Sequence, residues 1–285
     1  MAARLELGSP SGGPAAPSRR DVPSALRALA VAAAAAMSVV GLFEFFVRTH
    51  EGQRLDQVAL NHVGSSDHTR TLVASLLQDI TVGGLTVVLI ACAVVAFVRR
   101  RWALAAGAFV IVAGAIATTE ILKHFVLIRP DLGYKSTNSL PSGHTTVVAS
   151  LVLAALLVVP LAGRWAVALA GSVGISVTGV GTVVATWHRP SDVVAALAVT
   201  LAWGAVVLAV LSLTHGTEPA SRPTARPFAL IAGLAIAAAL FIALGVRPDG
   251  TVKDLLVHLI TMCGLATLGA GVVGLFTWMV DTRFS

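Results

Sequence analysis

Apolar runs recur along nearly the whole chain, separated by short polar stretches. They lie at about 28–47, 77–98, 102–122, 144–162, 165–187, 192–213, 227–245 and 255–280. A helix of about twenty apolar residues is long enough to cross the ~30 Å hydrocarbon layer of a membrane. The pattern therefore predicts an all-α integral membrane protein, a polytopic bundle of about eight helices.

Charged side chains are too few to cover the surface of a soluble domain. Of the 285 residues, 12% are charged and 56% are hydrophobic. The net charge of +6 would suit binding to nucleic acid, but the basic residues are scattered between the apolar runs. The run of arginines at 99–101 is typical of a membrane topology signal. We expect contacts with membrane lipids and none with nucleic acid.

The chain begins with a segment that has little to form a core. Residues 1–23 include a Gly-Ser-Pro-Ser-Gly-Gly-Pro stretch, which predicts a disordered tail. The first apolar run follows Arg19, Arg20 and Arg27, as in a signal peptide, but it is long and no convincing cleavage site follows. We expect an uncleaved first span. In the polar stretch at 49–75, Leu55 and Val58 lie among polar residues and predict a short amphipathic helix at the membrane surface.

The distribution of basic residues predicts the orientation in a plasma (inner) membrane. With both termini in the cytoplasm, eleven of the twenty Lys and Arg residues lie on the inner side. Three of the other nine are Lys123, Arg129 and Arg189, which belong to a candidate functional site. Without these three, the bias is eleven to six. This excess of basic residues on the cytoplasmic side places the helix ends that carry Lys123, Arg129 and Arg189 on the outer face.

Two cations end the third apolar run. Lys123 lies at the end of the run, and Arg129-Pro130 follows it. A lysine at a helix end can extend to the lipid headgroups, and Arg-Pro can simply be a turn. These structural readings stay open for each residue taken alone.

The fourth run opens with Pro-Ser-Gly-His at 141–144. Ser142 and Gly143 fall at a helix start, where free backbone N–H groups bind anions. A serine N-cap is common at any helix start, so the motif by itself is also compatible with a purely structural role.

His188 and Asp192 are four residues apart, and Pro190 suits the first turn of the sixth apolar helix. A carboxylate one turn along can accept a hydrogen bond from one imidazole nitrogen and leave the other nitrogen basic. The alternative is a pair that only caps a helix.

Taken together, these residues suit attack on a phosphate ester at one membrane face. Cations offset the charge of the phosphate oxygens. One histidine can attack phosphorus, and the other can protonate the departing oxygen and then activate water. The sequence has no carboxylate cluster that suggests a two-metal site, so we expect chemistry without a metal or cofactor.

These motifs resemble those of the type-2 phosphatidic acid phosphatase family, membrane lipid phosphate phosphatases related to vanadium haloperoxidases. The family pattern is Lys, six residues and Arg-Pro; then Pro-Ser-Gly-His; then Ser-Arg, five residues, His, three residues and Asp. Pro-Ser-Gly-His matches fully at 141–144, and His188 with Asp192 matches the end of the third motif. The likeness spans about residues 40 to 213. It implies a six-helix phosphatase core at 24–213, and 214–285 would add a cytoplasmic loop and two further transmembrane helices.

The resemblance also implies roles for the site residues. His188 would be the nucleophile, Asp192 would orient it, and His144 would be the general acid. Phosphate would be held by Lys123, Arg129 and the backbone around Ser142 and Gly143.

Two departures from the family pattern bear on phosphate binding. Five residues, not six, separate Lys123 from Arg129, so Lys123 needs a local distortion of its helix to reach the same phosphate. The family's Ser-Arg pair is replaced by Gly181 and Thr182, so one phosphate-binding arginine is missing. Arg189 could turn back and replace it, or it could face the headgroups.

The sequence thus predicts a metal-independent enzyme that hydrolyses a lipid-linked phosphate or diphosphate at the outer face. Phosphatidic acid, phosphatidylglycerol phosphate and polyprenyl phosphates are the candidate substrates by resemblance. A lipid phosphotransferase and a non-catalytic lipid-binding or transport protein on the same core are the alternatives. The residues neither choose among these lipids nor indicate an oligomeric state.

Overall fold

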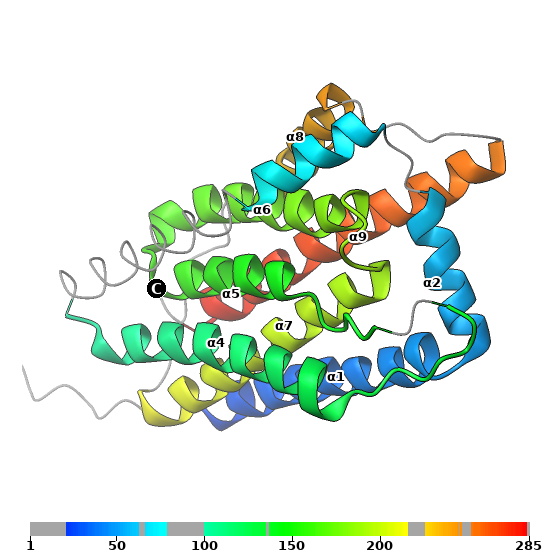
Figure 1. Cartoon of the computed structure of the whole chain (residues 1–285). Helices are drawn as coiled ribbons and strands as arrows, with labels where there is room; N and C mark the ends of the chain where they lie inside the picture. Colours follow the sequence, from blue (N-terminus) through cyan, green and yellow to red (C-terminus); the bar gives the residue numbers. More distant parts are fainter. Residues whose placement is uncertain are drawn as a thin grey trace, which may run out of the picture.

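The structure is a computed structural model. It describes residues 21–62, 66–78, 100–134, 137–215, 226–244, 246 and 252–283. Within these residues every regular element is helical (Figure 1). The predicted all-α class is therefore confirmed for the described part of the chain. The proposed tail lies largely outside it, although helix α1 already begins at Val22, before the predicted boundary at residue 23.

Most of the helices match the predicted apolar runs. Residues 67–78 are also helical, and the named elements are α1 (Val22–Leu42), the π-helical turn η1 (Phe43–Val47), α2 (His50–His62), α4 (Trp102–Ile121), the π-helical turn η2 (Leu122–Val126), α5 (Gly143–Val158), the 3-10 turn η3 (Leu161–Gly163), α6 (Arg164–Val184), α7 (Pro190–Thr214), α8 (Arg226–Ala243) and α9 (Val252–Asp281).

Five helical segments of the described chain are long and apolar enough to cross a membrane. They are Val22–Val47, Trp102–Val126, Leu161–Val184, Pro190–Thr214 and Leu255–Asp281, and Gly143–Val158 and Pro227–Ala243 are shorter apolar helices. The predicted run at 77–98 falls almost entirely outside the described residues. The count of six core helices plus two therefore stays a prediction, whereas a helical membrane protein fits the observed elements.

Helices α8 and α9 pack into the bundle with the other helices. Helix α6 contacts both of them, and α9 also contacts α5 and α7 (Figure 1). Phe276 of α9 is fully buried in the same apolar core as Ile111 of α4 and Leu153 of α5. A Cβ at Gly204 of α7 would lie 2.8 Å from the Phe276 ring, so glycine permits this close approach. The region after residue 213 thus shares one core with the helices before it.

Both described ends of the chain lie at one end of the bundle. The Asp21 backbone N–H donates to the Ser212 carbonyl at 3.1 Å, and Arg283 Nη2 donates to the Ser24 carbonyl at 2.7 Å. Helix α7 runs from that end to Pro190 at the opposite end, where α2 crosses the bundle (Figure 1). The predicted site residues lie at this opposite end.

The stretch at 49–75 contains two helices. The predicted amphipathic surface helix corresponds to α2, although Gln53 and Asp56 of its inner face are buried. The second helix, at 67–78, begins ten residues before the predicted second span and packs Val73 and Leu77 against Val180 and Val184 of α6. The stretch at 49–75 is therefore not polar throughout in the structure, because Val73 and Leu77 already bury one face of this second helix.

Candidate active site

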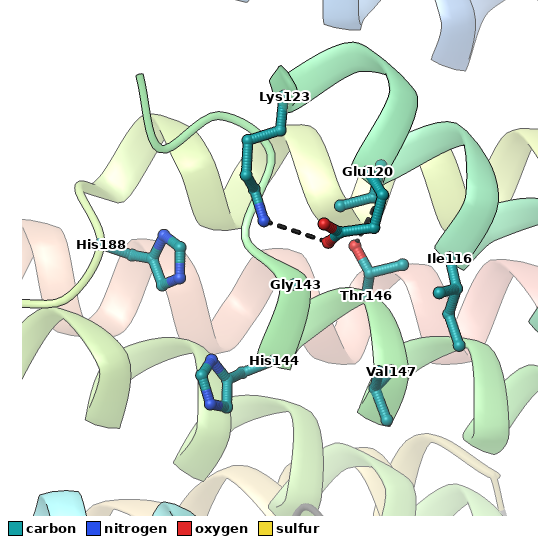
Figure 2. A pocket seen from close by; sticks show the side chains of 9 residues that line it. Ile116, Glu120, Lys123, Gly143, His144, Thr146, Val147 and His188 are labelled. Carbon is teal, nitrogen blue, oxygen red and sulfur yellow. Dashed lines mark hydrogen bonds and ion pairs between the residues drawn. The ribbon is translucent and has the colours of Figure 1, made fainter. Parts of the chain in front are cut away.

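A cavity of about 340 Å³ opens at the end of the bundle that carries the predicted motifs. Its walls come from α4 and η2, from the start of α5 and from the turn before α7 (Figure 2). The lining residues are Ile116, Thr119, Glu120, Lys123, Gly143, His144, Thr146, Val147 and His188. Three segments that are far apart in the sequence thus meet at one polar pocket.

His188 is fixed by its neighbours on both sides. Its Nδ1 lies 3.4 Å from Asp192 Oδ2, and its backbone N–H donates to the Thr182 carbonyl at 3.2 Å. Asp192 is 1% exposed and also accepts the Arg189 backbone N–H at 2.8 Å. Because Nδ1 faces the carboxylate, the Nε2 lone pair is the one left for the cavity.

His144 stands opposite, in the first turn of α5. Its ring centroid is 6.1 Å from that of His188 and 5.2 Å from the indole ring of Trp187. Figure 2 shows both imidazoles at the same pocket, His144 from the first turn of α5 and His188 from the turn before α7. The two rings could therefore address one bound group from two directions.

Lys123 reaches the pocket from a distorted stretch of helix. It belongs to η2, in which the Leu127 backbone N–H donates to the Leu122 carbonyl at 2.8 Å, five residues back. The π-helical turn is a local distortion of the kind expected from the spacing of Lys123 and Arg129. Lys123 Nζ lies 3.3 Å from Glu120 Oε1 and would lie 3.4 Å from a Cβ at Gly143, so the ammonium group sits beside the start of α5 (Figure 2).

Arg129 and Arg189 lie close together inside the protein, and neither is among the residues that line the cavity. They are 7% and 3% exposed, and Arg189 Nη1 donates to Ser139 Oγ at 3.0 Å. Burial, and then the charge of Arg189, lower the pKa of Arg129. Arg129 Nε and Nη2 have no hydrogen-bond partner within the described residues. Arg189 is therefore an interior cation, and the headgroup-facing position considered for it is wrong.

Ser142 links two of the site helices. Its hydroxyl oxygen accepts the Thr145 N–H at 3.4 Å as the N-cap of α5, and its own backbone N–H donates to the Asp192 carbonyl at 2.9 Å. Ser142 is fully buried and is not among the lining residues, whereas Gly143 is. The backbone N–H groups at the very start of α5, those of Gly143 and His144, are the ones that lie next to the pocket.

Thr182 stands at the position where the resemblance would place a phosphate-binding arginine. It is buried, its hydroxyl donates to the Gly179 carbonyl at 2.9 Å, and its carbonyl accepts the backbone N–H groups of Trp187 and His188. This residue shapes the turn that carries His188 but supplies no charge.

The loop between the first two motifs is held by Asn138. Its amide nitrogen donates to the carbonyls of Lys123, Leu127 and Leu140 at 3.2, 2.8 and 3.3 Å. These bonds fix the path of the chain between η2 and α5, so Asn138 orders the loop.

Asp56 is a site residue that the sequence did not point to. It is 2% exposed, and its carboxylate accepts the Ser191 N–H at 3.1 Å and the Ser191 hydroxyl at 2.5 Å. Burial, and then the neighbouring charge of Asp192, raise the pKa of Asp56 to about 6. No motif marks this residue, because its partner is 135 positions away in the sequence.

Comparisons of the chain with protein-family models, with curated proteins and with solved structures found no match. A function can therefore be inferred only from the residues of the pocket and from the motifs that they form.

Proposed function

We propose that this protein is a membrane phosphatase that hydrolyses lipid-linked phosphate through a phosphohistidine. One observation carries the proposal: His188, paired through Nδ1 with the buried Asp192, shares a cavity with His144 and Lys123. A nucleophile, a proton donor and a cation at one pocket are the parts that displacement at phosphorus requires.

In the first step, the Nε2 lone pair of His188 forms a bond to phosphorus, and the bond from phosphorus to the lipid oxygen breaks. His144 in its protonated form gives its proton to that oxygen. Asp192 stabilises the positive charge that develops on the His188 ring. The products are a phosphohistidine and the lipid alcohol, or a lipid monophosphate when the substrate is a diphosphate.

In the second step, water attacks phosphorus and the bond from phosphorus to Nε2 breaks. The neutral His144 takes the proton of the attacking water, because the residue that acts as acid in one half-reaction acts as base in the other. Inorganic phosphate leaves, and both imidazoles return to their initial forms.

Three cations supply the charge that holds a phosphate dianion. Lys123 lines the cavity itself. Arg129 and Arg189 are buried and do not line it, and because the protein interior screens charges weakly, their field can act on a dianion bound at this end of the bundle. On this proposal Arg189 takes the place of the arginine that Thr182 replaces.

The cavity suits a substrate that stays partly in the bilayer. Ile116 of α4 and Val147 of α5 form apolar walls next to the polar residues. Phe125 of η2 and Ile128, which follows η2, are 81% and 80% exposed, and exposed apolar side chains of this kind can contact lipid near the segment that carries Lys123. A lipid can then enter sideways between helices, with its tail in the hydrocarbon and its phosphate at His188. The basic residues at the other end of the bundle favour an outer-face site in the plasma membrane.

Phosphate release by purified protein tests the proposal. The panel contains phosphatidic acid, phosphatidylglycerol phosphate and polyprenyl mono- and diphosphates in mixed micelles, with wild type, His188→Ala and, as a matched control, the exposed His68→Ala. We expect release from at least one lipid by wild type and by His68→Ala, inhibition by orthovanadate, and none from His188→Ala.

The other outcomes separate the alternatives. Release that requires an acceptor lipid would indicate a phosphotransferase. Lipid binding by folded wild type without release from any lipid would contradict the proposal and favour a lipid-binding or transport protein.

A further inference from the structure

Helix α2 presents two buried polar side chains to the site end of the bundle. Gln53 is fully buried and Asp56 is 2% exposed. On the opposite side of the same helix, Glu51 and Arg54 pair with each other in solvent. The helix runs across the ends of the bundle helices (Figure 1). A surface helix that buries an amide and a carboxylate, rather than apolar side chains, requires a specific partner for each.

Gln53 joins α2 to the arginine segment of the site. Its Nε2 donates to the Val47 carbonyl at 2.7 Å and to the Pro130 carbonyl at 3.1 Å. Pro130 directly follows Arg129. The Gln53 amide therefore fixes the end of η1 and the backbone next to Arg129 at the same time.

Asp56 joins α2 to the nucleophile segment. Its two carboxylate oxygens accept the backbone N–H and the hydroxyl of Ser191, in the first turn of α7. His188 lies three residues before Ser191, and Asp192 is the next residue. The position of this turn sets the distance between Asp192 and His188.

The charges that face Asp56 are those of the candidate site. The charge of Asp192 raises the pKa of Asp56, and the charge of Arg189 lowers it. The charge of Asp56 in turn raises the pKa of Arg129. A second carboxylate buried beside Asp192 has an unfavourable interaction with it, which a helix cap alone does not require. The two contacts of Asp56 with Ser191 therefore point to a role in holding the turn before α7.

We propose that α2 is a clamp, in which Gln53 and Asp56 are positioning residues that hold the Arg129 segment and the His188–Asp192 turn in register. The catalytic part of this inference rests on the proposed phosphatase activity. A glycine makes the clamp possible, because a Cβ at Gly52 would lie 1.9 Å from the Phe45 carbonyl oxygen. Only glycine lets α2 approach η1 this closely.

Lipid phosphate hydrolysis by Asp56→Ala, Asp56→Asn and the exposed control Glu51→Gln tests the clamp. We expect Asp56→Ala to lower kcat about 100-fold with little change in KM, because the nucleophile turn loses its fixed position. Asp56→Asn can keep both contacts with Ser191, so we expect it to recover most of this loss. Its pH profile of kcat/KM should lack the bend near pH 6 that ionisation of Asp56 gives to the wild type. Glu51→Gln should match the wild type in both respects.

A double-mutant cycle separates positioning from general stability. Asp56→Ala and Ser191→Ala should be strongly non-additive in kcat, because each removes the same contact. Additive effects, or an Asp56→Ala protein that unfolds at a lower temperature while its kcat and pH profile stay those of the wild type, would overturn the clamp.

A readout without turnover keeps the clamp and the phosphatase proposal distinguishable. Diethyl pyrocarbonate modifies imidazoles, and peptide mass spectrometry follows His188 alone. We expect faster modification of His188 in Asp56→Ala than in the wild type and in Glu51→Gln, because the ring is less firmly held. If the wild type hydrolyses no lipid but this difference appears, the phosphatase proposal fails and the clamp stands; equal rates would overturn the clamp.

Discussion

Asp192 holds His188 across the start of α7, with 3.4 Å between Asp192 Oδ2 and His188 Nδ1. The carboxylate is itself fixed by the Arg189 backbone N–H at 2.8 Å. This arrangement favours the proton on Nδ1 and leaves Nε2 as the nitrogen that the proposed mechanism uses as its nucleophile. The importance of this contact can be measured by replacing the Asp192 carboxylate with an amide of the same shape.

Asp192→Asn should lower kcat by roughly 100- to 10,000-fold, because the amide favours the wrong imidazole tautomer and cannot stabilise the positive ring. Substrate binding should change little, since Asp192 does not line the cavity. Steady-state kinetics with Asp67→Asn, an exposed aspartate, as the control would measure this. A kcat within a few-fold of the wild type would show that the pair only caps the helix.

Arg129→Ala and Arg189→Ala should each lower kcat/KM by about 10- to 100-fold, because each removes a buried positive charge whose field stabilises the bound phosphate dianion. The exposed Arg48→Ala, whose side chain pairs with Glu44, should have no effect. Arg189→Ala with normal activity, beside an inactive Arg129→Ala, would show that Arg189 does not replace the missing arginine.

Asp56 should make the folded protein less stable as the pH rises from about 4 to about 6. Its folded-state pKa of about 6 lies above the ordinary aspartate pKa of 3.8, so the folded state binds the proton more tightly, and the stability gained from that proton is lost as the pH rises through this window. Asp56→Asn lacks this titration. Relative to wild type, its free energy of unfolding should therefore rise by up to about 3 kcal/mol between these pH values and then level off. Thermal or denaturant unfolding across the window measures the difference, and a constant difference would contradict the buried, coupled carboxylate.

Gly52→Ala should displace α2, because the new Cβ would overlap the Phe45 carbonyl oxygen, a backbone atom that cannot move aside cheaply. We expect loss of activity and a fall in unfolding free energy of about 1–3 kcal/mol. Gly41→Ala is the matched control, since nothing lies within 4 Å of a Cβ there. Equal behaviour of the two variants would mean that α2 does not need this close approach.

Contacts between near neighbours in the sequence were predictable. The apolar runs gave the helices, and the four-residue spacing of His188 and Asp192 gave their contact, because both follow from helix geometry. The shortened spacing of Lys123 and Arg129 indicated a distortion, and η2 lies there.

Contacts between distant segments were not predictable. The direction of the Arg189 side chain depends on Arg129 and Ser139, 60 and 50 residues away. Asp56 reads as one more polar residue of a surface helix until α2 is placed against α7. A single sequence carries no local signal for either.

The central claim is a covalent phosphate on His188. Wild-type protein mixed with its lipid substrate and quenched in alkali, in which phosphohistidine is stable, can be digested and mapped by mass spectrometry. We expect phosphate on the peptide that carries His188 in the wild type. In His188→Ala we expect neither phosphate on the corresponding peptide nor hydrolysis of the lipid. Undiminished lipid phosphate hydrolysis by His188→Ala would contradict it.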